Sequence, residues 1–352
     1  MTGARARSGT LDEPTDPETR AETVGTPKSD PGGGKPWFKW LGRAAIVSFI
    51  ALAGFLLWRT LREYSLTELV DAITRFPLNR LGYAAFFAAA SYLSLTCFDW
   101  LGTRYVRRPL AYRRVALASF VSLSLGHSIG FAGLSSGVIR YRFYSRWGLR
   151  VQEVAKLILF SGLTVGLGLA TLGSLATLVR PEIAADVMGL GVPATMAVGG
   201  LAAVAVVLYL IGSAFLRRPL QIRSFQLEMP PLKLAVGQVV VGTINFMLVA
   251  ACLHQAILGL ADVPYTSAAT VYVLANAGVM ITHVPGGLGI IEAVVLTLLS
   301  EARLIASLLV FRFVYFIAPL ALGAICFGAT EAIWRLRQGK KLGRQINTKP
   351  AR

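Results

Sequence analysis

Charged side chains are scarce in this chain of 352 residues, at 15% of the sequence, and acids are the scarcer kind, with 18 Asp and Glu against 35 Lys and Arg. In soluble globular domains roughly a quarter of the residues are charged. Hydrophobic residues make up 55% of this chain instead. The balance excludes an ordinary water-soluble enzyme, because too few polar side chains remain to cover a folded surface.

Cysteine and histidine are also rare, with three of each. Cys97, Cys252 and Cys326 lie in apolar stretches without metal-ligand spacing, and no three histidines and acids form a metal-ligand run. The sequence also lacks a nucleotide-binding loop. We therefore predict free buried thiols, no metal site and no cofactor, with transport energy taken from gradients or from downhill scrambling.

Long apolar runs are abundant. Six are long enough to cross the ~30 Å hydrocarbon core as helices of about 20 residues, near 41–58, 81–103, 154–179, 192–216, 232–259 and 304–334. Two further apolar segments, 115–146 and 267–303, are interrupted by Gly or Pro, which disfavours a straight helix. We predict an all-α polytopic membrane protein with a membrane domain over 37–334, a disordered cytoplasmic tail over 1–36 and a basic cytoplasmic tail over 335–352.

Loop charge predicts orientation, because short cytoplasmic loops carry an excess of Lys and Arg. The loops over 104–114, 140–156 and 217–233 and the C-terminal tail are basic, whereas the loops over 180–191 and 260–266 are not. The basic excess therefore indicates membrane topology rather than nucleic-acid binding. Both termini are predicted to be cytoplasmic. The loop over 59–80 is placed outside, although it carries four Arg against three acids.

An internal repeat relates the two halves of the chain. An offset of 152 residues superposes the apolar runs over about 41–179 on those over about 192–334 without a gap. It also superposes the two breaks, with Gly126 on Gly278 and Gly133 on Pro285. Each half then has three transmembrane helices and one re-entrant helical hairpin, and loop charge requires the second half to run inverted. Inverted repeats with paired Gly- or Pro-interrupted segments are typical of secondary transporters with a substrate site between the halves.

The two breaks could bind an anion. Each hairpin is expected to return through a half-helix whose first turn lies at the tip, near Gly133–Gly137 and near Gly286–Gly289. Unpaired N–H groups and the positive end of the helix dipole attract an anion there, and glycine allows close backbone approach. A phosphate group is the candidate ligand. The alternative is that these glycines only form tight turns or helix contacts.

Charged residues follow both tips. Arg140 and Arg142 come directly after GLSSG, and the repeat equates Glu292 with Arg140. A guanidinium binds phosphate in a bidentate manner, whereas a carboxylate can meet an amine or pair with an arginine. Arg312 lies inside the last apolar span, where an ionisable residue implies a function and a partner, and Glu292 is the partner we propose. The alternative is a buried ion pair that only fixes helix register.

Asp99 is a weaker signal. It lies near the inner end of its apolar run, and Arg104, Arg107 and Arg108 follow just beyond it. We interpret it as an interfacial counter-charge for these arginines.

Other motifs have structural alternatives. His127, Asn276 and His283 lie at or beside the breaks, where they either line a polar path for protons or are satisfied by the backbone. Gly162 and Gly166 form a G-x-x-x-G pair typical of helix packing. The G-x-S-x-G pattern over 133–137 matches a hydrolase nucleophile elbow, but that elbow requires a sheet, which an all-helical chain does not supply.

The segments GLSSGVIRYRFYSRWGL (133–149) and HVPGGLGIIEA (283–293) resemble the two signature regions of the lysylphosphatidylglycerol synthase transmembrane family. The resemblance covers about residues 41–334 and implies the lipid-translocating half of its bifunctional members. In those members a soluble aminoacyltransferase domain follows the membrane part; here the chain stops at Arg352, so we expect no enzymatic activity. The positions that match the motifs, and thus the expected substrate-binding residues, are Gly133, Ser135, Ser136, Gly137, Arg140, Arg142, Pro285, Gly286, Gly287, Gly289 and Glu292; Arg312 is added to them.

The leading hypothesis is a bacterial inner-membrane lipid translocase that moves a phospholipid or related lipid between leaflets. One alternative is a membrane subunit or enzyme of lipid modification, and another is a secondary transporter of a small anion. The partners expected are membrane lipids, especially anionic phospholipids, but not nucleic acid. A second copy of the chain and a separate lipid-modifying enzyme are further candidate partners.

Overall fold

The computed structural model describes residues 76–129, 132–216, 220–222, 225–282, 290–295 and 301–347, together with Thr74. The chain divides into two units, Met1–Val47 and Ser48–Arg352, and the first lies outside the described residues. The predicted N-terminal tail and the predicted span over 41–58 also lie outside them.

The described residues contain five helical segments long and apolar enough to cross a membrane. Four of them are α3 (Leu78–Tyr105), α6 (Val151–Val179), α8 (Val192–Phe215) and α9 (Leu232–Leu258). The fifth, Ala306–Leu336, belongs to a continuous run of α12 (Glu301–Arg312), the π-helix η2 (Phe313–Ile317) and α13 (Ala318–Asn347). Each begins and ends within three residues of the predicted run. Five of the six predicted spans are therefore confirmed as apolar helices.

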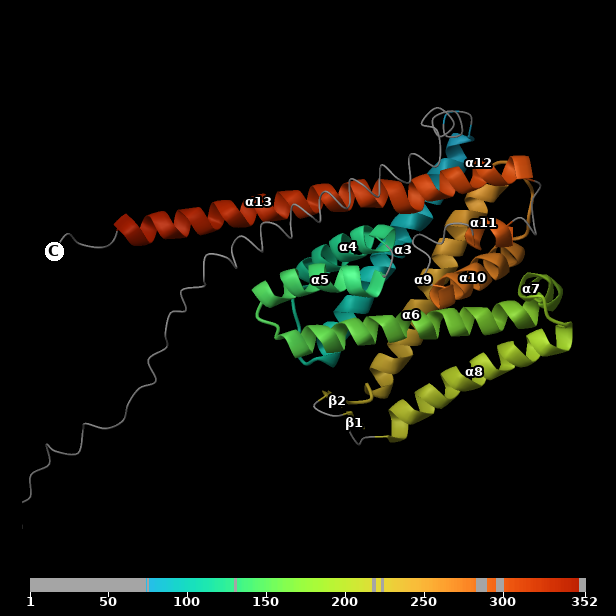
Figure 1. Ribbon diagram of the computed structural model, residues 1–352, viewed down its shortest axis with the longest axis horizontal. Coiled ribbons are helices and arrows are strands. Elements are labelled where there is room, and N and C mark those ends of the chain that lie inside the picture. The colour runs from blue at the N-terminus through green and yellow to red at the C-terminus, as the bar shows by residue number, and fades with distance from the viewer. Residues whose placement is uncertain are drawn as a thin grey trace, which may run out of the picture. The chain divides into compact units, whose positions relative to one another are not determined.

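Both interrupted segments are broken where the sequence predicts. The first forms α4 (Tyr112–Ile129) and α5 (Ala132–Arg146), which pack against each other as a helical hairpin (Figure 1). The second begins with α10 (Tyr265–Thr282), against which the short α11 (Ile290–Val295) packs. Gly126 and Gly278, which the repeat equates, lie where the two arms of their hairpins meet. A Cβ at Gly126 would lie 2.8 Å from the Ser136 Cβ, and one at Gly278 would lie 3.2 Å from the Ile290 Cγ2.

Short elements fill two of the loops. The helix α7 (Pro181–Met188) ends at Gly189, whose φ of 64° caps the helix in the left-handed conformation that glycine tolerates. The strands β1 (Leu220–Ile222) and β2 (Phe225–Leu227) form an antiparallel hairpin in the basic loop, with Leu220 opposite Leu227. Helices and this hairpin make up the regular structure of the described part of the chain.

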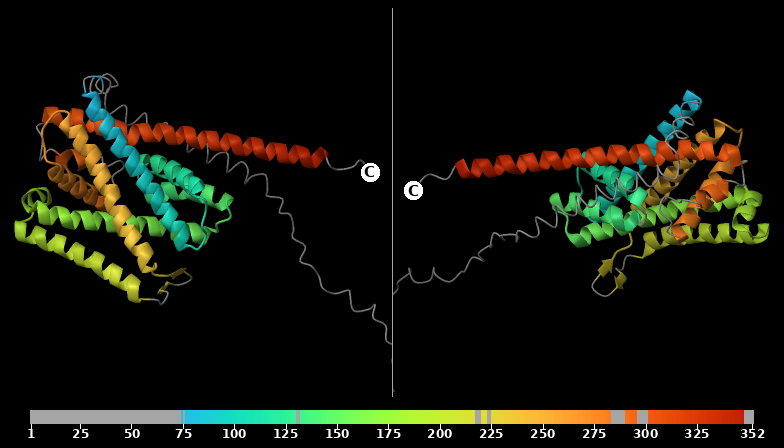
Figure 2. Two further views of the ribbon diagram at one scale, coloured as in Figure 1. Left: turned by 180° about the vertical axis from the view of Figure 1, so that it is seen from behind. Right: turned by 45° about the horizontal axis from the view of Figure 1, so that its top comes forward.

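The helices α3 and α9 form the most extensive contact between elements (Figure 2). Arg80, near the start of α3, donates to Gln255, near the end of α9. At the other end, Leu101 of α3 contacts Gly237, near the start of α9. The two helices therefore run antiparallel. The offset of 152 residues equates these two helices with each other.

Glycine sets the closest helix crossing. The helix α6 crosses α9 at Gly168 and Gly242, where a Cβ on Gly242 would lie 2.5 Å from the carbonyl oxygen of Thr164. Gly162 and Gly166 instead have open space around their Cβ positions. The interpretation of those two glycines as the packing motif is therefore wrong. Helix α6 contacts α9 through a different face, at Thr164 and Gly168.

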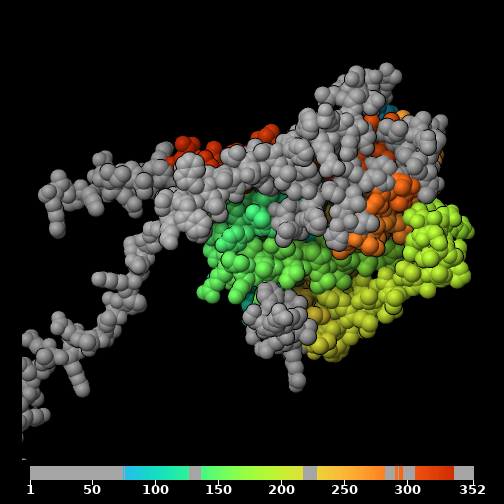
Figure 3. Space-filling view, in the orientation of Figure 1, coloured from blue at the N-terminus to red at the C-terminus, as the bar shows by residue number. Residues whose placement is uncertain are grey.

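The peripheral helix α8 carries much of the exposed apolar surface. It packs beside α6, as Figure 3 shows, and only 17% of its most apolar window is buried. Leu201, Val204 and Leu208 are among its exposed side chains. An apolar surface of this extent is stable in lipid rather than in water. The three cysteines are free thiols, as predicted. Cys252 is buried, and Cys97 and Cys326 are partly buried.

Candidate functional site

Asp99 of α3 and Arg140 of α5 form a buried ion pair. The Arg140 Nε donates to the Asp99 Oδ2 at 2.9 Å, and its second terminal nitrogen, Nη2, donates to the Asp99 Oδ1 at 2.9 Å. The two side chains are 5% and 0% exposed, for Arg140 and Asp99 respectively. Two parallel hydrogen bonds between a guanidinium and a carboxylate are a strong, directional interaction.

Three further side chains complete this cluster, here called the Asp99 network. The Tyr144 hydroxyl donates to the Asp99 Oδ2 at 2.9 Å, and the Ser161 hydroxyl of α6 donates to the Oδ1 at 3.0 Å. The Arg140 Nη1 donates to the Ser136 Oγ at 3.0 Å. Asp99 thus accepts four hydrogen bonds, which matches the capacity of an ionised carboxylate. The network joins α3, α5 and α6.

The partner of Asp99 differs from the sequence interpretation. Arg104 stacks over the Trp100 ring at 3.6 Å, Arg107 pairs with Glu228, and Arg108 pairs with Glu153. Asp99 instead is fully buried, whereas these three arginines are exposed. The interpretation as an interfacial counter-charge is therefore wrong. The signal that could have identified the pair is that a single acid in an apolar run needs a buried partner.

A second polar cluster, here called the central network, lies at the middle of the bundle. Ser91 of α3 donates to the Asn245 Oδ1 of α9 at 2.8 Å, and its hydroxyl lies 3.1 Å from the Tyr315 hydroxyl. Tyr92 donates to the Tyr315 carbonyl oxygen at 3.2 Å. Ser91 and Asn245 lie midway along their helices, and Tyr315 belongs to the π-helix η2. Local π-helical turns are frequent at functional sites.

The sequence analysis did not identify the central network. Its signal was Asn245, an amide in the middle of an apolar run of 27 residues. The two networks are eight residues apart along α3, which corresponds to about 12 Å at 1.5 Å per residue. Buried Ser94 and Thr96 lie between them on the same helix.

Arg142 follows Arg140 by two residues but joins a different cluster. Residues two apart on a helix point in different directions. Arg142 accordingly donates to the Glu331 Oε1 of α13 at 2.8 Å. The two arginines of one sequence motif therefore have separate carboxylate partners.

The other predicted site residues divide into two groups. Ser136 belongs to the Asp99 network, Gly137 lies against Ile158 of α6, and Arg312 is buried. The Asn276 amide donates to the carbonyl of Tyr272 on its own helix at 2.8 Å. The side chains of His127, Ser135 and Glu292, the surroundings of Gly133, and the whole of His283, Pro285, Gly286, Gly287 and Gly289 lie outside the described residues. The pairing of Glu292 with Arg312 stays a prediction.

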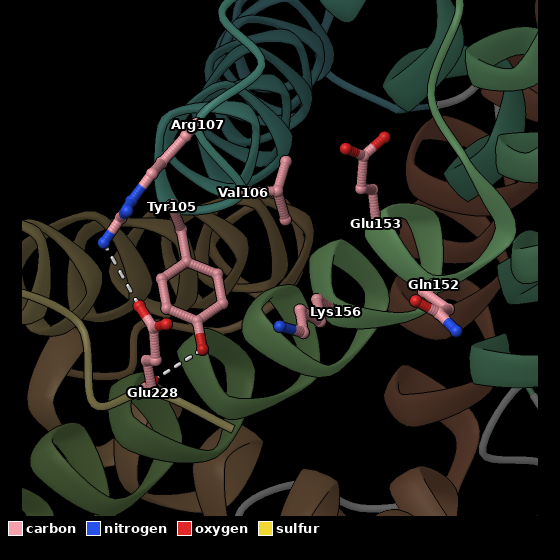
Figure 4. A pocket seen from close by; sticks show the side chains of 7 residues that line it. All are labelled: Tyr105, Val106, Arg107, Gln152, Glu153, Lys156 and Glu228. Carbon is pink, nitrogen blue, oxygen red and sulfur yellow. Dashed lines mark hydrogen bonds and ion pairs between the residues drawn. The ribbon is translucent and has the colours of Figure 1, made fainter. Parts of the chain in front are cut away.

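A cavity of about 210 Å³ lies at the ends of α3 and α6 (Figure 4). It is lined by Tyr105, Val106, Arg107, Gln152, Glu153, Lys156 and Glu228. The Tyr105 hydroxyl donates to the Glu228 carbonyl at 2.6 Å, and Arg107 pairs with the Glu228 carboxylate at 3.3 Å. Two bases and two acids line the cavity, so its charges offset one another. The sequence analysis did not predict this cavity.

Comparison with known proteins places the chain in a family. A sequence model of the lysylphosphatidylglycerol synthase transmembrane region matches residues 44–323. The chain belongs to this family. The resemblance of its two motifs, predicted from the sequence, is confirmed.

Three relatives illustrate the range of this family. An uncharacterized protein of Synechocystis sp. is 27% identical over 80% of this chain and 88% of its own length. The inner membrane protein YbhN of Escherichia coli K12 is 29% identical over 81% of this chain and 85% of its own length. A phosphatidylglycerol lysyltransferase of Staphylococcus aureus is 24% identical over 78% of this chain, but the match spans only 32% of the lysyltransferase. This family member is therefore a membrane protein related to lysyltransferases through part of their length.

Proposed function

We propose that this family member is a lipid translocase of the bacterial inner membrane that moves an anionic phospholipid, or a related lipid, between leaflets. The observation that carries the proposal is the Asp99 network, a hydrogen-bonded ion pair buried among apolar helices. Ionisable residues at membrane depth are costly and mark pathways for charged substrates. The relationship to a protein named for phosphatidylglycerol supports a lipid substrate.

The Asp99 network provides a phosphate-binding group inside the bundle. A phosphodiester that reaches Arg140 replaces Asp99 as partner of the guanidinium, since both anions accept two parallel hydrogen bonds. Tyr144 and Ser161 keep the Asp99 carboxylate hydrogen-bonded during this exchange. The headgroup charge is thereby compensated while it lies within the hydrocarbon region, where an uncompensated charge is prohibitively costly.

Polar groups continue from this network toward the centre of the bundle. Buried Ser94 and Thr96 lie between Asp99 and the central network on α3. A headgroup that moves between the two networks meets the Ser94 hydroxyl, which faces α9, whereas Thr96 points to Tyr112 of α4. The central network then lies near the midplane, where secondary transporters bind their substrates.

We further propose that the fold is a pair of inverted repeats with re-entrant hairpins. The antiparallel packing of α3 and α9, which the repeat equates, supports this arrangement, and so do the equivalent glycines of the two hairpins. The second tip, with Gly286–Gly289 and Glu292, then serves the opposite end of the substrate path together with Arg312. Both termini are cytoplasmic in this arrangement.

Arg140→Ala tests the proposal in proteoliposomes that contain fluorescent phosphatidylglycerol. Outer-leaflet quenching is expected to show translocation by the wild-type protein and the rate of protein-free liposomes for Arg140→Ala. Arg113→Ala is the matched control, because Arg113 is an exposed arginine at the start of α4. The Arg140→Ala protein is first shown to be folded by its elution volume and by a cooperative unfolding transition. Translocation at the wild-type rate by this folded variant would contradict the proposal.

A second candidate function is that of a membrane subunit in lipid modification, working with a separate soluble enzyme. The match to phosphatidylglycerol lysyltransferases favours it. The lipids of a strain that lacks this protein distinguish the two functions. Loss of a translocase alters how a lipid is distributed between leaflets, whereas loss of a modification subunit removes a headgroup species from the total lipid extract.

A further inference from the structure

A cluster of arginines surrounds one carboxylate where the end of α5 meets α13. The Glu331 carboxylate accepts from Arg142 at 2.8 Å, from Arg146 at 3.1 Å and from Arg335 at 3.4 Å. This group is here called the Glu331 cluster. It shares no residue with the Asp99 network, and the translocation mechanism proposed above does not use it.

The Glu331 cluster carries excess positive charge. Three guanidiniums share one carboxylate among the residues whose side chains are described, and Glu331 is only 12% exposed. The Arg142 side chain is 25% exposed, and its Nε is buried without a hydrogen-bond partner in the described part of the chain. A buried donor of a charged group is costly to leave unpaired. The cluster therefore has both the charge and a donor for a second anion.

Aromatic side chains place the cluster at the level of lipid headgroups. The Arg146 guanidinium lies over the Trp334 ring at 3.8 Å, and Trp147 packs edge-on against Trp334 at 6.4 Å. The apolar span Ala306–Leu336 ends two residues after Trp334. Tryptophan is enriched at membrane–water interfaces, where its ring is apolar and its N–H finds polar partners.

Apolar side chains beside the cluster are exposed. Val138, one turn before Arg142 on α5, is 65% exposed, and Leu336, next to Arg335 on α13, is 69% exposed. An anion with acyl chains would cover this surface, whereas a soluble anion would leave it bare. These neighbours favour a lipid over free phosphate.

We propose that the Glu331 cluster binds the phosphate of an anionic phospholipid, with Arg142 and Arg146 as its ligands, as a resident site distinct from the translocation path. The phosphodiester accepts hydrogen bonds from the Arg142 Nε and from the Arg146 guanidinium, while Glu331 accepts from the remaining guanidinium nitrogens. By loop charge the site faces the cytoplasmic leaflet. A lipid bound here joins the return arm of the first hairpin to α13.

Native mass spectrometry of the full chain in detergent, with added phosphatidylglycerol or phosphatidylcholine, measures this binding. Replacing both ligands, Arg142→Gln/Arg146→Gln, is expected to lower phosphatidylglycerol retention by about fivefold for each guanidinium removed, the effect of one basic residue near an anionic lipid. Phosphatidylcholine retention should not change. Arg113→Gln is the matched control and should retain phosphatidylglycerol as the wild type does.

Glu331→Gln provides a test with the opposite sign. Removing the competing carboxylate frees guanidinium donors, so phosphatidylglycerol retention should rise, whereas a purely structural cluster would lose stability without gaining lipid. Equal retention by the double variant and the wild type, or an equal loss in Arg113→Gln, would overturn the proposal. Displacement of the lipid by equimolar inorganic phosphate would assign the site to a soluble anion and overturn it too. Retention is measured without translocation, so it stands or fails separately from the proposed function.

Discussion

Asp99 and Arg140 stabilise each other because either charge alone would be buried in the apolar interior without a counter-ion. Desolvation of a single ion in an apolar interior costs several kcal/mol even after relaxation. The bidentate pair, together with the hydroxyls of Tyr144 and Ser161, offsets that cost through four hydrogen bonds to one carboxylate. The ion pair is therefore a unit, and removing one member does more harm than removing both.

Asp99→Ala is expected to destabilise the protein by about 3–5 kcal/mol, because it leaves Arg140 buried and uncompensated. Replacing both residues by apolar ones of similar volume, Asp99→Leu/Arg140→Met, should recover most of that loss. Titration with sodium dodecyl sulfate in mixed micelles measures the unfolding free energy. Arg107→Ala is the control, since its exposed pair with Glu228 contributes less than about 1 kcal/mol. A double variant as unstable as Asp99→Ala would contradict the expectation.

The sequence predicts single residues better than it predicts their partners. Arg140 stands out because an arginine after a hairpin tip in an apolar segment has few structural explanations. Asp99 is 41 residues away on another helix, and the pairing is a tertiary contact that no local pattern encodes. The arginines at 104, 107 and 108 are nearer in the sequence, but they lie on exposed surface, which periodicity in a nearly uniformly apolar helix does not reveal.

Helical elements are predictable here because the bilayer requires them. A segment of about 20 apolar residues must satisfy its backbone internally, which only a helix achieves within one segment. The spans and both breaks therefore follow from hydropathy and from Gly and Pro positions. The crossing at Gly168 and Gly242 does not, because the contacts of a glycine depend on which face of its helix meets a neighbour.

Gly242→Ala tests that crossing. The added Cβ would lie 2.5 Å from the Thr164 carbonyl oxygen and 3.1 Å from the Gly168 Cα, so α6 and α9 must separate. A loss of about 1–3 kcal/mol is expected, the usual cost of overpacking. Gly200→Ala on α8 is the control, because nothing lies within 4 Å of its Cβ position. A Gly242→Ala protein as stable as the control would show that the helices absorb the methyl group without strain.

Within the described residues, the two helices with the most extensive contact, α3 and α9, run antiparallel, and the predicted repeat equates them. A prediction about topology follows from this arrangement and from loop charge. Single cysteines introduced near Gly148 and near Leu299, in a background without native cysteines, should react from opposite sides of the membrane. Impermeant thiol reagents applied to intact cells and to inverted vesicles measure this. Labelling of both positions from one side would contradict the inverted arrangement.

The 352-residue chain is also expected to transfer no aminoacyl group by itself. Transfer from tRNA requires a water-exposed surface for the charged acceptor end, and the described residues are mainly apolar helices with short connections, followed by the basic end of α13. Purified protein is incubated with lysyl-tRNA and phosphatidylglycerol, and lipid products are identified by mass spectrometry. Aminoacylated lipid formed without an added enzyme would assign the chemistry to the membrane helices.

The Asp99–Arg140 pair also has a consequence for biogenesis. Asp99 is synthesised 41 residues before Arg140, which corresponds to a delay of about 2–8 s at translation rates of 5–20 residues per second. An unpaired aspartate opposes insertion by about 2.5–3.5 kcal/mol at the centre of a helix, and by less at the position of Asp99, six residues before the end of α3. The helix α3 is therefore poorly suited to move from the insertion machinery into the lipid without a partner helix. We expect α3 to stay beside the insertion machinery until α5 has delivered the guanidinium of Arg140.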